Sequence, residues 1–172
     1  MNLFFRLFIE WLGSLRRPRL GVLDTSAVTL RVWPGDLDLW GHVNNGVYLS
    51  LADLGRFDLM VRCGLFGLAR KNKWALVQGA ATVVFRKPLT LFQQYTLLTR
   101  VMSWDEKWIY LESRFERGGA LIALIIVRAL ARSSSGNIAT SEVISGLGTT
   151  VASPQLAPQL QQSFEQFAAL TK

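Results

Sequence analysis

The sequence predicts an α+β domain in which a curved antiparallel sheet of about five strands wraps around one long central helix, with helical additions at both chain ends. The first observation is a helical pattern over 45–63 whose apolar positions cover well over half of its circumference, so something must enclose it. The second is the order of the β-prone runs, because one precedes this helix and four follow it. A sheet that curls around the helix satisfies both observations.

The length and composition favour a single domain. The chain has 172 residues, which suits one full hydrophobic core. We expect a helix and basic linker over 1–20, the main domain over 21–150, and a linker and helix over 151–172. The net charge of +7 favours an anionic partner, which the charge alone does not identify. Cys63 is the only cysteine, which excludes an intrachain disulfide or a thiolate zinc cluster and is compatible with the cytoplasm.

The first twelve residues predict a short amphipathic helix. Its apolar face carries Phe4, Leu7, Phe8 and Trp11, with Arg6 and Glu10 elsewhere. This helix is too short to span a bilayer, which needs about 20 apolar residues. Two interpretations stay open. Either the helix docks onto the protein body or a second copy, or residues 1–19 lie peripherally at the inner membrane surface with Arg16, Arg17 and Arg19 at the lipid headgroups.

The elements of the main domain follow in order. A strand is predicted over 23–33 and is ended by Pro34 and Gly35. The long helix follows, with Asn45 as its N-cap and Gly64 as the residue that stops it. Strands are predicted over 74–86, 95–104, 107–117 and 120–133. The last is apolar on both sides, which predicts an interior strand.

Helices are also expected after the last strand. A short helical stretch is predicted near Glu142, and a terminal amphipathic helix follows. The apolar face of the terminal helix carries Leu160, Phe164 and Phe167.

The strand predicted over 107–117 alternates in character. Ile109 and Leu111 alternate with Tyr110, so one side of this strand should face the core and the other should be half solvated.

The polar segment 35–48, just before the long helix, is the most promising place for chemistry. It holds two carboxylates, Asp36 and Asp38, upstream of a helix start. The first amides of a helix are unpaired and carry positive partial charge, so they can polarise a carbonyl and stabilise an oxyanion. The segment therefore predicts a carboxylate acting beside backbone donors.

This segment resembles the hotdog-fold acyl-CoA thioesterases related to hydroxybenzoyl-CoA thioesterase. The first motif is Asp36-x-Asp38-x-x-Gly41-His42-Val43-Asn44-Asn45-x-x-Tyr48. The second is Ala81-x-Val83-x-Phe85-Arg86-x-Pro88-Leu89, in the next strand. With the strand order, the resemblance covers about 28–132 and implies a hotdog fold.

The resemblance implies that the chain hydrolyses an acyl-CoA, with Asp38 as nucleophile or general base. The backbone amide of Asn45, together with Gly46, would stabilise the oxyanion. The strand around Gln78 would line the site across a dimer interface, in a homodimer or tetramer. No separate cofactor is expected, since coenzyme A is part of the substrate, although acyl-carrier protein is an alternative carrier. The substrate-binding candidates are His42, Asn44, Tyr48, Gln78, Gly79, Ala80, Arg86 and Lys87.

Each candidate also has a structural interpretation. The two aspartates are common turn formers, His42 is expected to fix the loop through its ring, and Asn44 is expected to cap the helix. Asp53 stands three residues before Arg56, which suggests an ion pair, and it is kept as a reserve catalytic acid. No metal site is expected, because a single histidine without clustered cysteines lacks a ligand set.

Three other functions are considered beside hydrolysis. A catalytically weak, membrane-associated acyl-binding protein on the same fold is the main alternative, and the N-terminal helix motivates it. Nucleic-acid binding is not expected, because the basic residues are not interleaved with aromatics and no reading motif is present. A hotdog dehydratase would need a pairing of His with an acid that the sequence does not show.

Overall fold

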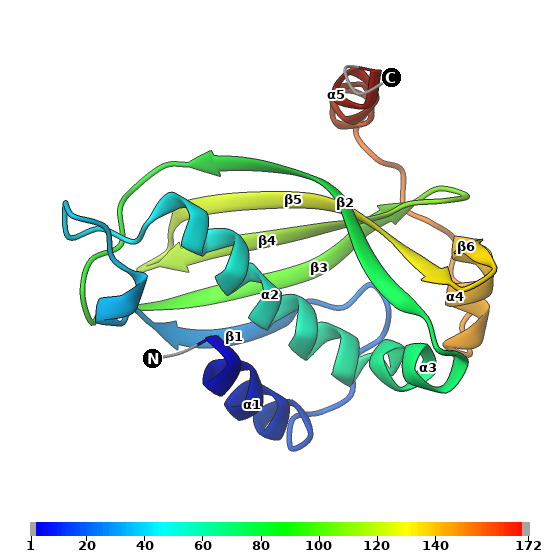
Figure 1. Cartoon of the computed structure of the whole chain (residues 1–172), viewed down its shortest axis with the longest axis horizontal. Coiled ribbons are helices and arrows are strands. Elements are labelled where there is room, and N and C mark those ends of the chain that lie inside the picture. Colours follow the sequence, from blue (N-terminus) through cyan, green and yellow to red (C-terminus); the bar gives the residue numbers. More distant parts are fainter. Residues whose placement is uncertain (1–2, 170–172) are drawn as a thin grey trace.

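The computed structural model describes residues 3–169, except for the side chain of Phe167. Its strands are β1 Ser26–Arg31, β2 Ala75–Phe85, β3 Gln94–Trp104, β4 Ile109–Arg117, β5 Ala120–Ser133 and β6 Gly136–Ile138. They form one curved antiparallel sheet in the order β1-β3-β4-β5-β2, with β6 paired to β5, and helix α2 (Asn45–Arg62) crosses one face of it (Figure 1). The predicted α+β class and the sheet wrapped around a central helix are confirmed.

Helix α2 begins and ends at identifiable caps. Asn44, rather than the predicted Asn45, is the N-cap, because its Oδ1 accepts a hydrogen bond from Gly46 N at 2.8 Å. At the other end, Gly64 takes φ +88°, a conformation that side chains disfavour, so the helix stops there as predicted. Gly55 lets the helix approach the sheet closely, since a Cβ there would lie 2.3 Å from Thr99 Oγ1.

The main core lies between α2 and the sheet. Tyr48, Leu51 and Leu54 are at most 2% exposed and pack with residues of the strands, among them Leu97 and Phe115. Fully burying one such side chain stabilises the fold by roughly 1.5–3 kcal/mol. Because Tyr48 is in the first turn of α2, this packing also fixes the position of the helix start.

One C-terminal helix packs on the opposite face of the sheet, against Tyr110. Helix α5 (Pro158–Ala169) buries Phe164, whose ring lies 5.9 Å from that of Tyr110 in β4. The prediction of a half-solvated side at Tyr110 is therefore wrong. Burial and a hydrogen bond to Asp105 raise the pKa of Tyr110 to about 12. The predicted role of Phe167 concerns a side chain outside the described residues.

Some short elements were predicted and others were not. Helix α4 (Thr140–Gly146) confirms the helical stretch near Glu142, and β5 lies between β4 and β2 as the interior strand predicted for 120–133. Helix α3 (Leu65–Asn72), the short 3-10 helix over Pro34–Asp36 and strand β6 had no counterpart in the prediction. These elements are only three to eight residues long, so periodicity gives them a weak signal.

Helix α1 (Leu3–Ser14) lies beside α2 (Figure 1) and confirms the predicted N-terminal helix. Its orientation differs from what an amphipathic helix normally adopts. The residues that it buries are polar, namely Arg6, Glu10 and Ser14, while Phe8 and Trp11 are exposed. Within residues 3–169, no helix combines the length and apolar character that crossing a membrane requires.

Candidate active site

The segment before α2 folds into a tight loop that holds Asp38 in place. Leu37 and Val43 form an isolated β-bridge, and the amide of Asp38 donates to the carbonyl of His42 at 2.8 Å. Gly41 has φ +75°, the left-handed conformation that glycine adopts at least cost, and its amide donates to the Asp38 carbonyl at 3.1 Å. The sequence around Gly41 therefore forms this loop because a glycine stands where the chain must reverse.

The carboxylate of Asp38 is half-buried and partly engaged by its own loop. Its Oδ1 accepts hydrogen bonds from the amides of Trp40, at 2.9 Å, and His42, at 3.3 Å. Within the described residues, no donor reaches Oδ2. Asp38 thus acts as a turn former through one oxygen, while the other has no described hydrogen-bond donor.

The start of α2 supplies one backbone donor. The Gly46 amide already donates to Asn44 Oδ1, and the Val47 amide donates to the Asn44 carbonyl at 2.9 Å. No acceptor for the Asn45 amide lies in the part of the chain that the structure describes. The geometry therefore favours Asn45 as the oxyanion donor and does not support Gly46 as a second one, because its hydrogen is used in the helix cap.

A surface cavity of about 280 Å³ brings six of the candidate residues together. They come from the loop, the start of α2 and the chain just after β2, and they are Asp38, His42, Asn45, Tyr48, Arg86 and Lys87. Residues far apart in sequence thus meet at one end of the sheet. A substrate carbonyl in this cavity can contact a carboxylate on one side and a helix amide on the other.

The two basic residues of this cavity are positioned by their backbone. The amides of Arg86 and Lys87 both donate to the carbonyl of Ile122, at 2.8 and 3.2 Å, which fixes the chain at the end of β2. Their side chains are exposed, and neither forms an ion pair with a described residue. They are therefore available to an anionic group of a ligand.

Tyr48 and His42 both line the cavity, one from the core and one from the loop. Tyr48 is 2% exposed, and its ring packs at 5.3 Å from Phe85 and 5.1 Å from Phe115, so it forms the floor of the cavity as a core residue. Burial raises the pKa of Tyr48, which keeps its hydroxyl protonated at neutral pH. His42 fixes the loop through its backbone amide and carbonyl, while no described residue bonds to its ring, so the predicted ring hydrogen bonds are wrong.

Gln78, Gly79 and Ala80 lie elsewhere in the protomer. They are in β2, and Gln78 lines a different cavity from the one that contains Asp38. A Cβ at Gly79 would lie 2.4 Å from the ring of Trp108, so contact with that indole explains the glycine. Within one chain, the structure does not bring this part of β2 to Asp38.

The second cavity is largely apolar and lies between the C-terminal half of α2 and the sheet. Its volume is about 280 Å³, and its walls include Phe57, Met60, Leu76 and Val127. Asp53 and Arg56 line it and form the predicted i, i+3 ion pair. These walls suit an apolar ligand better than a reaction that develops charge.

One further feature of this cavity was not found from the sequence. Arg56 Nη1 is buried without a hydrogen-bond partner, a position that no spacing pattern indicates. Cys63 also lines the cavity, and burial raises the pKa of its thiol, which disfavours the nucleophilic thiolate. Within residues 3–169, no three His, Cys, Asp or Glu side chains gather as metal ligands would.

Known proteins resemble the chain over most of its length. The family described as the thioesterase-like superfamily matches residues 32–145. Protein THEM6 of Danio rerio is 40% identical over 135 residues, which is 77% of this chain and 67% of that protein. Protein THEM6 of Drosophila melanogaster is 32% identical over 151 residues, or 87% and 76% of the two chains.

Solved structures share the fold. A probable thioesterase of Escherichia coli, YbaW, superposes with a TM-score of 0.66 at 20% identity and covers 71% of this chain and 96% of its own. A gentisyl-coenzyme A thioesterase superposes with a TM-score of 0.61 at 22% identity, covering 72% and 99%. At these identities the likeness shows the fold, and the hotdog prediction is confirmed.

Proposed function

Because the chain belongs to the thioesterase-like superfamily, we propose that it hydrolyses acyl-CoA thioesters in the cavity between Asp38 and the start of α2. The observation that carries this proposal is that Asp38 and Asn45 line the same cavity, while Asp38 Oδ2 and the Asn45 amide have no described partner. A thioester carbonyl placed between them would meet a base or nucleophile and an oxyanion donor. Relatives with thioesterase names, such as a probable thioesterase of Saccharomyces cerevisiae, support the reaction type.

Two routes are compatible with this arrangement. As a general base, Asp38 takes a proton from water while the water oxygen bonds to the acyl carbon; the carbon–sulfur bond then breaks and coenzyme A leaves as the thiolate. As a nucleophile, Asp38 bonds to the acyl carbon and expels the thiolate, and water then hydrolyses the mixed anhydride to the free acid. In both routes the Asn45 amide stabilises the negative oxygen of the tetrahedral intermediate.

The remaining cavity residues bind rather than react. The exposed side chains of Arg86 and Lys87 suit the phosphate groups of coenzyme A, because guanidinium and ammonium groups form charge-assisted hydrogen bonds to phosphate. The acidic surface of an acyl-carrier protein would be attracted by the same charges. The apolar cavity beside α2 suits an acyl chain or aromatic ring.

A hydrolysis panel tests the function. The purified chain is incubated with acyl-CoAs of increasing chain length, with aromatic acyl-CoAs and with acylated carrier protein, and the released thiol is measured. We expect a preferred class, with kcat/KM at least about tenfold above the poorest substrate, because each methylene that fits or misses an apolar pocket changes binding by roughly 1–3 kcal/mol. Activity on no member of the panel would contradict the proposal.

One observation favours a second candidate function. Asp38 Oδ1 is held by the amides of Trp40 and His42, as in an aspartate whose role is only to form a turn. An acyl-binding protein without turnover would keep that loop and both cavities. Binding of an acyl-CoA without release of thiol, measured by calorimetry on the same panel, would support this candidate.

We also propose that the chain is a homo-oligomer whose copies meet along β2. This strand is at one end of the sheet, and no strand in the described part of the chain pairs with its outer edge. Val77, Val84 and Phe85 in β2 are more than 40% exposed although they are apolar. Pairing of two β2 edges would cover them and bring Gln78 toward the other copy.

Replacing Val84 with glutamate is expected to halve the mass of the protein in sedimentation velocity, because two β2 edges would then place like charges side by side. If the site is shared between copies, kcat/KM should fall at least about tenfold in the same variant. Thr29→Glu is the matched control, since Thr29 is exposed on β1 at the other end of the sheet. A monomeric wild-type chain with full activity would refute the shared site.

A further inference from the structure

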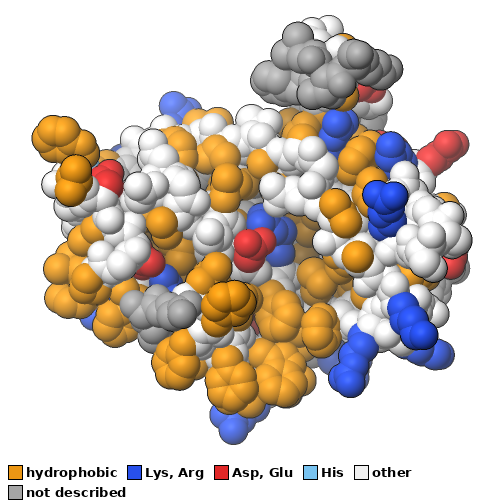
Figure 2. Space-filling view, in the orientation of Figure 1, with side chains coloured by type: hydrophobic (Ala, Val, Ile, Leu, Met, Phe, Trp, Pro, Cys, Tyr) orange, Lys and Arg blue, Asp and Glu red, His pale blue; other side chains and the backbone are white. Residues whose placement is uncertain are grey.

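Helix α1 presents an apolar face to the outside. On a helical wheel, the exposed apolar residues occupy one continuous arc, and they include Phe5, Phe8, Ile9, Trp11, Leu12 and Leu15. Their exposed fractions range from 36% at Trp11 to 59% at Leu15. Figure 2 shows these hydrophobic side chains gathered over α1 at the lower edge of the molecule. A patch of this kind usually marks a surface that contacts a partner or a membrane.

The opposite face of α1 is held by buried ion pairs, which fix the rotation of the helix. Arg6 Nη1 contacts both carboxylate oxygens of Asp36, at 2.7 and 3.0 Å, and Arg6 Nη2 donates to the carbonyl of Arg31 at 3.0 Å. The side chains of Arg6 and Asp36 are only 4% and 6% exposed. Turning α1 inward would separate these charges, at a large cost in a low-dielectric site.

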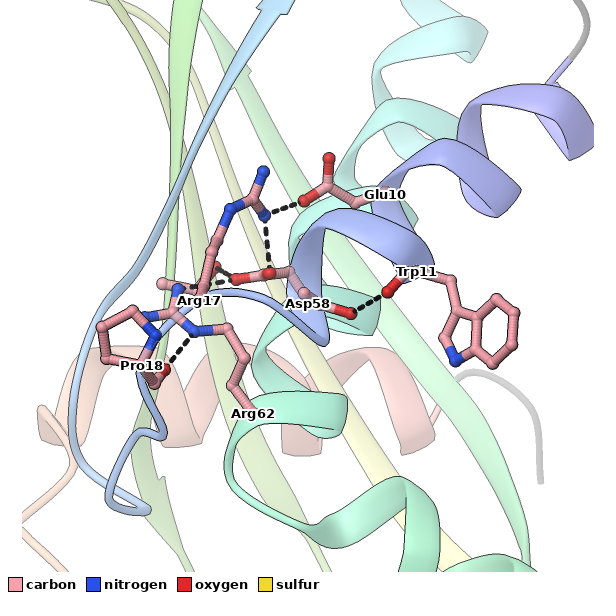
Figure 3. Close-up of polar contacts among 8 residues, drawn as sticks. Glu10, Trp11, Arg17, Pro18, Asp58 and Arg62 are labelled. Atoms are coloured by element: carbon pink, nitrogen blue, oxygen red, sulfur yellow. Dashed lines mark hydrogen bonds and ion pairs between the residues drawn. The ribbon is translucent and has the colours of Figure 1, made fainter.

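A second group of charges anchors the other end of α1, as Figure 3 shows. Arg17 lies between Glu10 of α1 and Asp58 of α2, bonding to Glu10 and, at 2.7 Å, to Asp58. Asp58 is fully buried and also accepts from Ser26 Oγ at 2.6 Å and from Arg62 at 3.0 Å. In Figure 3 the indole of Trp11 points away from these charges. The same contacts that dock α1 therefore keep its aromatic side outside.

The charges next to this face indicate which surface covers it. Arg16 and Arg19 follow directly after the helix and are exposed, and neither forms an ion pair with a described residue. A second copy of a chain with net charge +7 would bring such arginines together, whereas an anionic lipid surface would attract them. Trp11 adds an indole, a group that favours the level of the lipid headgroups.

We propose that α1 docks the protein on an anionic membrane surface, with the arc from Phe5 to Leu15 in the acyl–headgroup boundary and Arg16 and Arg19 at the headgroups. The helix lies in the plane of the interface and does not span the bilayer. The ion pair of Arg6 with Asp36, and the bridge that Arg17 forms between Glu10 and Asp58, attach this helix to the rest of the domain. This surface is separate from the cavity of Asp38, so membrane binding and hydrolysis are independent properties.

Vesicle flotation of the full chain tests the proposal. Vesicles of phosphatidylcholine alone are compared with vesicles that also contain phosphatidylglycerol, and the chain should float mainly with the anionic ones. Phe8→Ser/Leu12→Ser is expected to weaken binding at least about tenfold, because two apolar side chains no longer enter the interface. Arg16→Gln/Arg19→Gln should weaken binding to anionic vesicles by about tenfold or more and remove the preference for them.

Matched controls keep the outcome interpretable. Phe8→Leu/Leu12→Met retains apolar side chains at the same positions and should float like the wild type. The thermal midpoint of the serine variant and its hydrolysis of a soluble acyl-CoA should be unchanged, since neither residue is in the core or the cavity. Absence of flotation by the wild type, or equal flotation of the serine variant, would overturn the proposal. So would a serine variant of lower mass in lipid-free sedimentation, which would identify a second copy as the occupant.

Discussion

Replacing Asp38 with asparagine is expected to lower kcat for acyl-CoA hydrolysis by about 1,000-fold while the fold is kept. Asparagine retains an Oδ1 that can accept from the amides of Trp40 and His42, so the loop keeps its two side-chain hydrogen bonds. It loses the second carboxylate oxygen as a base or nucleophile. The measurement is steady-state thiol release on the best substrate of the panel, alongside circular dichroism.

Asp53→Asn is the control for this prediction. Asp53 is the other carboxylate that was considered as a catalytic acid, and it lines the apolar cavity, where it pairs with Arg56. Its side chain is 54% exposed, so the substitution should leave both stability and kcat close to wild type. If Asp53→Asn loses activity and Asp38→Asn does not, the catalytic roles are assigned to the wrong cavity.

The second large effect is expected from Arg6→Met. Methionine keeps much of the apolar contact of the arginine stem, but it leaves the Asp36 carboxylate buried without its cation. Removing one partner of a buried ion pair lowers the free energy of unfolding by about 3–5 kcal/mol. At about 2–4 °C per kcal/mol for a chain of this size, the thermal midpoint should fall by roughly 6–20 °C. Differential scanning calorimetry measures both values.

The double variant Arg6→Met/Asp36→Asn separates the unpaired charge from other causes. Asparagine removes the charge and can still accept from the amide of Trp33, which bonds to Asp36 Oδ2 at 2.9 Å. Part of the lost stability should therefore return. Arg16→Met, at an exposed arginine without a described ion pair, should change the midpoint little. If it costs as much as Arg6→Met, the buried pair is not what stabilises α1.

The fold was predictable because its main signals are long. The helix over 45–63 and the four strand runs after it each extend over ten or more residues, and the strand predicted over 120–133 has the bounds of β5. The capping residue of α2 was misplaced by one position, since Asn44 and Asn45 are both good caps and only the backbone conformation distinguishes them.

The sequence predicted most of the residues that line the candidate site, but not which of their atoms are free to bond a ligand. The loop and the helix start were correctly expected to adjoin, because they are consecutive in the chain, and the basic pair after β2 joins them in the structure. The use of the Gly46 amide in the cap depends on a side-chain rotamer that spacing does not reveal. Gln78 lies away from Asp38 because it is near the start of β2, whereas the end of this extended strand meets the Asp38 cavity.

The orientation of α1 had a signal that was present but not used. Arg6, Glu10 and Ser14 recur every four residues, which places them on one stripe of the helix. A polar stripe is normally assigned to solvent, so both interpretations of this helix buried its apolar side, against the protein body or a second copy in one and in a membrane surface in the other. The buried carboxylates of Asp36 and Asp58 determine which side of α1 faces the domain, because they attract the cations at its polar side. A sequence does not show that these carboxylates are buried.

Asp36 joins the N-terminal helix to the reaction cavity. Its carboxylate forms an ion pair with Arg6. Its backbone carbonyl accepts a hydrogen bond at 2.9 Å from the amide of Asn44, one residue before the proposed oxyanion donor. Removing residues 1–19 would therefore leave the buried Asp36 carboxylate without its cation, two residues away from Asp38. Any enzyme assay on such a shortened protein would measure damage to the reaction centre together with loss of lipid attachment, and only point changes on the outer side of α1 separate the two.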